Sequence, residues 1–188
     1  DKTLEIRRVE VVGPKVGKDL KTKALWAVGL SFAAILVFVA WRFKQVSYGL
    51  GGIAALVHDI IVTYGAISIA GLEYSLSLMA VILTIIGFSI NDTIVIFDRV
   101  RENIKKMRKE SLETVFNVSI NETLGRTILT SGTVMMVVLI LFFFGGPVIH
   151  DFALTLIVGL ISGTYSTIYV ASPVVLLWNK HFTRKKKR

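Results

Sequence analysis

Long apolar runs separated by shorter polar segments make up most of the chain. Five of these runs are long enough to cross a bilayer, over residues 24–41, 49–70, 76–97, 125–144 and 149–178. Runs of about 18 or more apolar residues are the usual sign of a helix that spans the roughly 30 Å hydrocarbon core. Backbone amides in hydrocarbon must be hydrogen-bonded within their own segment, and barrel strands would be shorter and alternating. The pattern therefore predicts an all-α polytopic membrane protein with a bundle of about five transmembrane helices.

The positions of Lys and Arg predict how this bundle is oriented. The segments at 71–75 and 145–151 contain no Lys or Arg, whereas the segment that follows the third run and the C-terminal tail contain many, at Arg99, Arg101, Lys105, Lys106, Arg108, Lys109, Lys180, Arg184, Lys185, Lys186, Lys187 and Arg188. Loops rich in Lys and Arg stay on the cytoplasmic side of a membrane. We therefore expect a cytoplasmic C-terminus and, with five spans, an extracytoplasmic N-terminus.

Three polar segments flank or interrupt the predicted bundle, which covers residues 24–178. Residues 1–23 combine a strand-like alternation at 4–12 with a predicted turn at GPKVG (13–17), and we interpret them as the end of an extracytoplasmic α+β domain. Residues 98–124 are expected to form a cytoplasmic loop and then a short amphipathic helix that lies on the membrane surface or docks a partner. The apolar face of that helix is Leu112, Val115, Phe116, Ser119, Ile120 and Leu124. Residues 179–188 form a basic cytoplasmic tail suited to anionic lipid headgroups.

Composition agrees with a membrane protein and excludes several other classes. Of the 188 residues 53% are hydrophobic and 19% are charged, and the mean hydropathy is +0.66. The absence of cysteine excludes disulfides and thiolate metal sites. We attribute the net charge of +9 to cytoplasmic loops rather than to binding of nucleic acid. No zinc spacing, phosphate-binding loop or Ser/His/Asp arrangement is present, so we expect neither a metal site nor a cofactor, and not an enzyme.

One carboxylate stands inside the third run, in the segment GFSINDTIVIFDRVREN (87–103). Asp92 lies five residues before the end of the run at Phe97, which is about 7 Å along a helix and too far for a short side chain to reach water. An aspartate at the centre of a span costs roughly 2.5–3.5 kcal/mol and usually marks an ion or proton path. We predict that Asp92 takes up and releases protons. The alternative is a purely structural pair with Arg126, at the cytoplasmic start of the fourth run.

A second carboxylate lies deeper, in the second run. Asp59 is ten residues into the run, about 15 Å deep, and follows His58. The pair is interpreted either as a proton relay or as a packing residue beside a hydrogen-bonded carboxylate. Ser89 lies one turn before Asp92, and we expect its hydroxyl to bond to that carboxylate.

Small residues predict where the helices approach one another. Gly159 and Gly163 form G-x-x-x-G in the last run, and Ala66 and Ala70 form a similar pair in the second. Three glycines cluster at the start of the second run, where we expect a broken first helical turn, at Gly49, Gly51 and Gly52.

Several segments together resemble one family of membrane proteins. They are VVGPKVGKDL (11–20), the pair His58–Asp59, GFSINDTIVIFDRVREN, NVSINETLGRTILTS (117–131), FGG (144–146) and GLISGTYSTIYVASP (159–173). These segments touch nearly every predicted span and resemble the membrane part of the SecF family of bacterial protein-export subunits.

The resemblance implies more than the residues alone indicate. It implies that the chain is the C-terminal part of a six-span half like those of resistance-nodulation-division transporters, with an extracytoplasmic domain between the first two spans. It also implies action with SecD, in which proton-motive force drives late export of preproteins through SecYEG. The aspartate of S-x-N-D and the arginine of R-T-x-x-T are the family's proton-path residues, which here are Asp92 and Arg126. Asp59 is a secondary member of this path.

Other interpretations of the sequence stay open at this point. The chain is also compatible with half of a proton-coupled small-molecule efflux transporter or with a passive scaffold of the translocon. Protons are the expected coupling ion, with sodium as the alternative. Further expected partners are YajC, YidC and membrane lipids, and the expected location is the bacterial inner membrane.

Overall fold

Every regular element in the described part of the chain is a helix. The computed structural model describes residues 14–43, 45–72 and 75–185. The elements in order are α1 (Pro14–Phe43), α2 (Val46–Ile69), α3 (Leu76–Lys106), α4 (Leu112–Phe144), α5 (Gly146–Ser166), the π-helix η1 (Thr167–Ala171) and α6 (Ser172–Lys185). The prediction of an all-α bundle is confirmed for these residues.

Four of the five predicted spans appear as helices long and apolar enough to cross a membrane. They cover Val46–Ile69, Ser77–Lys106, Leu112–Phe144 and Ile149–His181. The apolar part of α1 that the structure describes, Gly29–Phe43, is shorter. The chain is therefore a multi-pass membrane protein.

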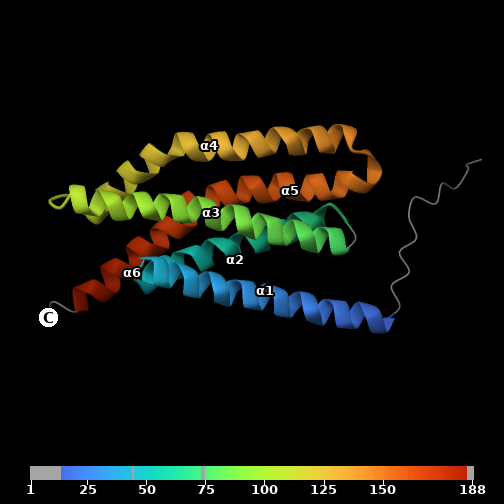
Figure 1. Ribbon diagram of the computed structural model, residues 1–188, viewed down its shortest axis with the longest axis horizontal. Coiled ribbons are helices and arrows are strands. Elements are labelled where there is room, and N and C mark those ends of the chain that lie inside the picture. The colour runs from blue at the N-terminus through green and yellow to red at the C-terminus, as the bar shows by residue number, and fades with distance from the viewer. Residues whose placement is uncertain (1–13, 44, 73–74, 186–188) are drawn as a thin grey trace, which may run out of the picture.

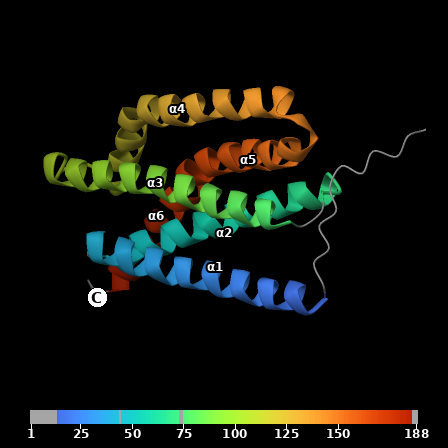
Figure 2. The same cartoon turned by 45° about the vertical axis from the view of Figure 1, so that its right-hand side comes forward.

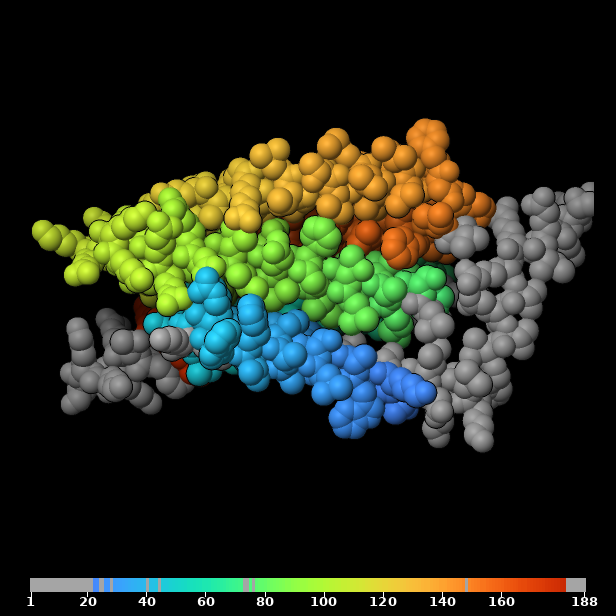
Figure 3. Space-filling model, viewed as in Figure 1, coloured from blue at the N-terminus to red at the C-terminus, as the bar shows by residue number. Residues whose placement is uncertain are grey.

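The long helices lie roughly side by side, as Figure 1 shows. Helix α4 forms one edge of the bundle, α1 forms the opposite edge, and α3 lies between them in the space-filling view of Figure 3. Helices α4 and α5 form a hairpin, and the turned view in Figure 2 shows that the first turns of α4 bend toward the end of α3. Helix α5 packs against α2, α3 and α4, so its small residues meet three neighbours.

The helices are longer than their apolar runs. Helix α3 continues nine residues past Phe97 to Lys106, where we predicted a loop, because these residues contain no glycine or proline. Side-chain pairs along the helix also support the extension, with Glu102 bonding both Arg99 and Lys106 at 2.6 Å. At 1.5 Å per residue, the 31 residues of α3 exceed the roughly 30 Å hydrocarbon thickness by about half. The end of α3 and the start of α4 therefore project beyond the hydrocarbon.

The predicted helix over 111–124 is the first part of α4 and not a separate element. Helix α4 is capped by Ser111, whose hydroxyl accepts a hydrogen bond from the Thr114 amide at 3.1 Å. From there α4 runs unbroken to Phe144. Its apolar face, including Val115 and Phe116, is buried within the protein. The predicted position on the membrane surface is therefore wrong.

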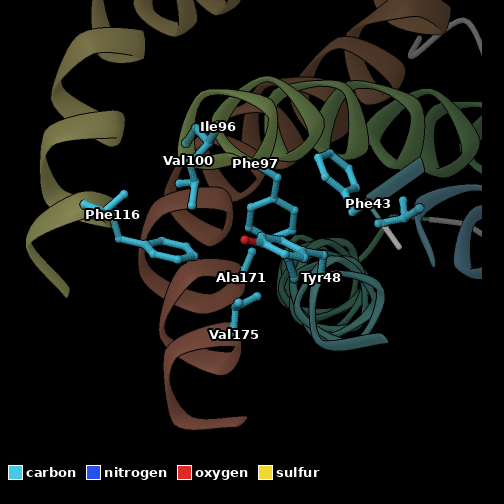
Figure 4. Packing of buried hydrophobic residues seen from close by; sticks show 11 residues of the cluster. Phe43, Tyr48, Ile96, Phe97, Val100, Phe116, Ala171 and Val175 are labelled. Carbon is cyan, nitrogen blue, oxygen red and sulfur yellow. The ribbon is translucent and has the colours of Figure 1, made fainter. Parts of the chain in front are cut away.

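The buried cluster that receives this face joins α1, α2, α3, α4 and α6 with the π-helix η1. Figure 4 shows Phe116 pointing from α4 toward Ala171 and Val175. On the other side of the cluster, the rings of Tyr48 and Phe97 lie 4.9 Å apart, and Phe43 at the end of α1 stacks on Tyr48 at 5.2 Å. The cluster fixes the helix ends near one face of the membrane.

Both ends of the described chain also differ from expectation. Helix α1 begins at Pro14, and proline is favoured at the first position of a helix. From Pro14 onward, the predicted turn at 13–17 is therefore helical instead. Residues 1–13 lie outside the described residues, and the extracytoplasmic domain stays a prediction. At the other end, α6 continues as helix to Lys185 within the predicted tail.

Gly159 of the glycine pair in α5 makes the close contact that its spacing predicted, whereas a Cβ atom on Gly163 would lie 3.4 Å from Cβ of Ser89, an ordinary contact. A Cβ atom on Gly159 would overlap the side chain of Ile85 on α3, so the two helices meet there at a distance that only glycine allows. The pair Ala66 and Ala70 behaves differently, because Ala66 is only partly buried and Ala70 is exposed at the end of α2. No close packing within the described bundle centres on that second pair.

The glycines at the start of α2 do not break the helix. Helix α2 is continuous from Val46 to Ile69, and Gly49, Gly51 and Gly52 are all buried within it. A Cβ atom on Gly51 would lie 2.7 Å from both the carbonyl oxygen of Ala171 and Cγ2 of Val175. Gly51 is therefore needed for close helix approach, and the expected broken turn is wrong.

We predict that Gly159→Ala lowers the free energy of unfolding by about 1–3 kcal/mol, because the new methyl group forces α3 and α5 apart. The measurement is the unfolding of the full-length protein in detergent. Gly87→Ala is the matched control, since a Cβ atom there meets nothing within 4 Å.

In a background that carries Ile85→Ala, the Gly159→Ala change should cost less, because the overlapping side chain is gone. Equal stability of Gly159→Ala and Gly87→Ala would contradict the packing account.

Candidate functional site

The Asp59 carboxylate is the most completely hydrogen-bonded group in the described bundle. It is fully buried, and it accepts hydrogen bonds from the hydroxyls of Ser89 at 2.6 Å, Ser162 at 2.7 Å and Ser166 at 2.8 Å. His58 Nδ1 lies 3.3 Å from the same carboxylate. Short bonds from three hydroxyls stabilise an ionised carboxylate in an interior that otherwise disfavours it. These bonds tie α2 to α3 and α5.

Two of these serines, Ser162 and Ser166, were not among the predicted site residues. The sequence does contain a pattern that could have indicated them, because small and polar residues recur every three or four positions along α5 and into η1 and therefore share one helix face. That face is Gly159, Ser162, Gly163, Ser166 and Thr167. All five are buried, so the face that allows close packing also supplies the hydroxyls.

His58 lies at the edge of this cluster and not inside it. Its side chain is 31% exposed, and its ring lies 5.9 Å from that of Tyr165, which stacks on Tyr169 at 4.9 Å. Both tyrosines are exposed on the described chain. The structure brings His58 and Asp59 together, as predicted, and leaves both the relay and the packing interpretation open.

The helix geometry changes next to the cluster. Residues Thr167–Ala171 form a π-helix between α5 and α6. Pro173 has no amide hydrogen and its ring would clash with the carbonyl group four residues earlier, so a wider turn before it relieves the clash. The hydroxyl of Ser172 bonds the carbonyl oxygen of Thr167 at 3.3 Å, which satisfies one group left over by the irregular turn.

The Asp92 carboxylate has far fewer partners than Asp59. It is buried, with 6% of its surface exposed, and its only side-chain hydrogen bond in the described residues comes from Ser131 on α4 at 3.5 Å. The predicted bond from Ser89 is wrong, because that hydroxyl points across to Asp59 instead. The hydroxyl of Ser89 therefore bonds the carboxylate of Asp59 on the neighbouring helix α2, and not the carboxylate of Asp92 on its own helix α3.

A small cavity opens beside Asp92 between α3, α4 and α5. Its volume is about 10 Å³, measured as space for the centre of a water-sized sphere. The lining residues are Phe88, Ser89, Asp92, Ser131, Gly159, Leu160, Gly163 and Thr164. The two glycines that bring α5 close to α3 therefore also border this cavity.

Arg126 makes no ion pair among the described residues. Its side chain is exposed near the middle of α4, because the helix begins at Leu112 and not at the predicted start of the run, and Asp92 has no salt bridge to it. The structural pair that was the alternative explanation for Asp92 is not formed in this structure. The next residue, Thr127, is buried, and its hydroxyl has no hydrogen-bond partner among the described residues.

Outside the hydrocarbon, polar contacts attach the start of α4 to the end of α3. Glu122 accepts hydrogen bonds from Arg99 at 2.7 Å and from Asn103 at 2.6 Å, and Asn103 also donates to Ser119 at 3.0 Å. These contacts join the two helices through one shared carboxylate.

The bundle is a multi-pass membrane protein with two buried carboxylates between its helices, and intramembrane carboxylates in such proteins often mark paths of ions or protons. A family model described as protein export membrane protein SecD/SecF, C-terminal, matches residues 1–181. The chain belongs to this family.

Individual relatives agree with the family match. The protein translocase subunit SecF of Desulfurispirillum indicum is 47% identical over 182 residues, which cover 95% of this chain and 58% of that protein. SecF of Haemophilus influenzae is 48% identical over 171 residues, covering 91% and 52%. The chain therefore spans a little more than half the length of these two relatives.

A solved structure has the same fold. SecDF from Thermus thermophilus, described as a translocon-associated membrane protein, superposes with a TM-score of 0.86 at 45% identity. The match covers 90% of this chain and 24% of that one.

Removal of the Asp59 carboxylate should destabilise the protein strongly. In Asp59→Ala the buried hydroxyls of Ser89 and Ser162 lose their acceptor, and we expect a loss of roughly 3 kcal/mol or more in the free energy of unfolding. Asp98→Ala is the control, because Asp98 is half-exposed in a pair with Arg42, and such a pair contributes about 0–1 kcal/mol. Similar losses in the two variants, measured in detergent, would show that the serine contacts do not stabilise the bundle.

Proposed function

We propose that this chain is the C-terminal membrane part of a SecF subunit that acts with SecD in protein export. In this proposal the complex uses proton-motive force to drive late translocation of preproteins through SecYEG, and the chain is not an enzyme. The support is the family match together with relatives named as SecF translocase subunits. Those names favour export over the alternative of a small-molecule efflux transporter.

The observation that carries the mechanism is the contrast between Asp92 and its surroundings. The carboxylate is buried, has one long hydrogen bond and lies beside a cavity that can admit water. Such a group can gain or lose a proton without breaking a set of strong contacts. Asp92 is thus the proposed proton carrier, and Arg126 near the middle of α4 supplies positive charge along the same path. Asp59 is proposed as the secondary member that keeps the helices of the path in place.

The coupling energy is large enough for a conformational change. One proton that crosses a potential of roughly 150 mV releases about 3.5 kcal/mol. Protonation of Asp92 would remove the charge that faces α4, so the packing of α3 against α4 and α5 differs in energy between the two states. The proposed coupling ion is the proton, with sodium as the alternative.

The proposed location is the bacterial inner membrane, with the C-terminus in the cytoplasm and residues 1–23 outside. The support is the number of Lys and Arg residues at the end of the bundle where α3 ends and α6 ends. YajC, YidC and the anionic lipids near the basic tail are further proposed partners.

We predict that Asp92→Asn abolishes the part of export that depends on a proton gradient while assembly stays normal. The measurement is export into membrane vesicles that contain the full complex, with and without the gradient. Asp98→Asn on the same helix is the matched control, since Asp98 is half-exposed and paired with Arg42.

Normal export by Asp92→Asn, with an intact response to the gradient, would leave Asp92 a structural residue. A passive scaffold predicts that result, because an amide keeps the hydrogen bond from Ser131.

A further inference from the structure

The polar groups around the cavity are spaced too widely for direct contacts to satisfy them well. The hydroxyl of Ser131 lies 3.5 Å from the Asp92 carboxylate, and the hydroxyl of Thr164 lies 3.3 Å from that of Ser131. Good hydrogen bonds between oxygen atoms are about 2.7–2.8 Å long. In the Asp59 cluster the corresponding bonds are 2.6–2.8 Å, so the long contacts are particular to the Asp92 side of the bundle.

The cavity has the size and the lining that a single water molecule needs. A buried water requires about 10–15 Å³ of space for its centre and two to four polar partners. The cavity provides about 10 Å³ and is bordered by one carboxylate and three hydroxyls, from Asp92, Ser89, Ser131 and Thr164. The hydroxyl of Ser89 is already directed to Asp59, which leaves the other three groups to bind the water.

We infer that this cavity binds a water molecule that links Asp92 to Ser131 and Thr164. The inference rests on the proposed function of Asp92 as a proton carrier and adds the ligand and two positioning residues to that site. Water both donates and accepts hydrogen bonds, as hydroxyls do. The three partners can therefore turn so that Asp92 is hydrogen-bonded in either protonation state.

The hydroxyl of Thr164 has a second acceptor, so its hydrogen can be redirected without the loss of a hydrogen bond. It lies 2.9 Å from the carbonyl oxygen of Leu160 as well as 3.3 Å from Ser131. With Asp92 ionised, Thr164 donates to Ser131, Ser131 donates to the carboxylate, and the water donates one hydrogen to the carboxylate and the other to the Thr164 oxygen. With Asp92 protonated, its hydrogen is donated to the water, the water donates to the oxygens of Ser131 and Thr164, Ser131 donates to the carbonyl oxygen of the carboxyl group, and Thr164 donates to Leu160. One proton is added to the carboxylate between the two states, and no buried donor is left without an acceptor.

The test compares three substitutions of threonine in the full complex in membrane vesicles. Thr164→Val keeps the shape but removes the hydroxyl, and gradient-driven export should fall about tenfold, the effect of losing one hydrogen bond in a chain that ends on a charged group. Thr164→Ser restores the hydroxyl and should restore export. Thr84→Val is the matched control, because the Thr84 hydroxyl also bonds the carbonyl oxygen four residues earlier, at 2.8 Å, but is exposed. Ser131→Ala provides a second variant with the same expected loss.

A spectroscopic measurement detects the water itself. Infrared difference spectra between the protonated and deprotonated complex should contain an O–H stretch that shifts in water labelled with oxygen-18. The band should be absent in Thr164→Val and present in Thr84→Val.

The inference is overturned if Thr164→Val responds to the gradient as the wild type does, if Thr164→Ser fails to restore export, or if no labelled water band exists. Loss of the gradient response in Asp92→Asn together with a normal response in Thr164→Val would retain the proposed function and reject the water. A normal response in both variants would reject the two together.

Discussion

The bundle depends on how it accommodates the buried carboxyl group of Asp59. A carboxylate with no exposed surface is costly unless hydrogen-bond donors surround it, and here α3 contributes one hydroxyl and α5 contributes two. The donors reach the carboxylate because α5 presents glycines and serines on one face, which lets its backbone approach both α2 and α3. Close packing and charge stabilisation are therefore consequences of the same stripe of small residues.

This arrangement leaves the second carboxylate in a different physical state. Since Ser89 is used by Asp59, Asp92 keeps only a long bond to Ser131 and borders a cavity instead of a set of donors. The fold thus separates a carboxylate that joins three helices through short hydrogen bonds from a carboxylate with a single long one. The π-helical turn at Thr167–Ala171 lies directly after the two serines of α5 that donate to Asp59.

Much of the fold follows from hydrophobic runs, because a span must be long, apolar and internally hydrogen-bonded. This reasoning predicted four spans, the close contact at Gly159 and the burial of Asp59 and Asp92. The helix ends were not predicted, since α3 and α4 extend beyond their apolar runs on the strength of side-chain pairs and a serine cap. The partner of Ser89 was also inaccessible, because periodicity relates residues on one helix and does not tell which neighbouring helix faces them. For the same reason Ser131 and Thr164 carry no signal by themselves, and they become significant only when α4 and α5 are placed beside α3.

The most direct test of this account is an infrared titration of the full complex in lipid vesicles, with the aspartate carboxyl carbons of this subunit alone labelled with carbon-13. The account predicts a carboxyl band from a buried aspartate that grows and fades with pH in the wild type and is missing from Asp92→Asn. Persistence of that band in Asp92→Asn would contradict the account, because the titrating buried group would then be a different aspartate, with Asp59 the first candidate.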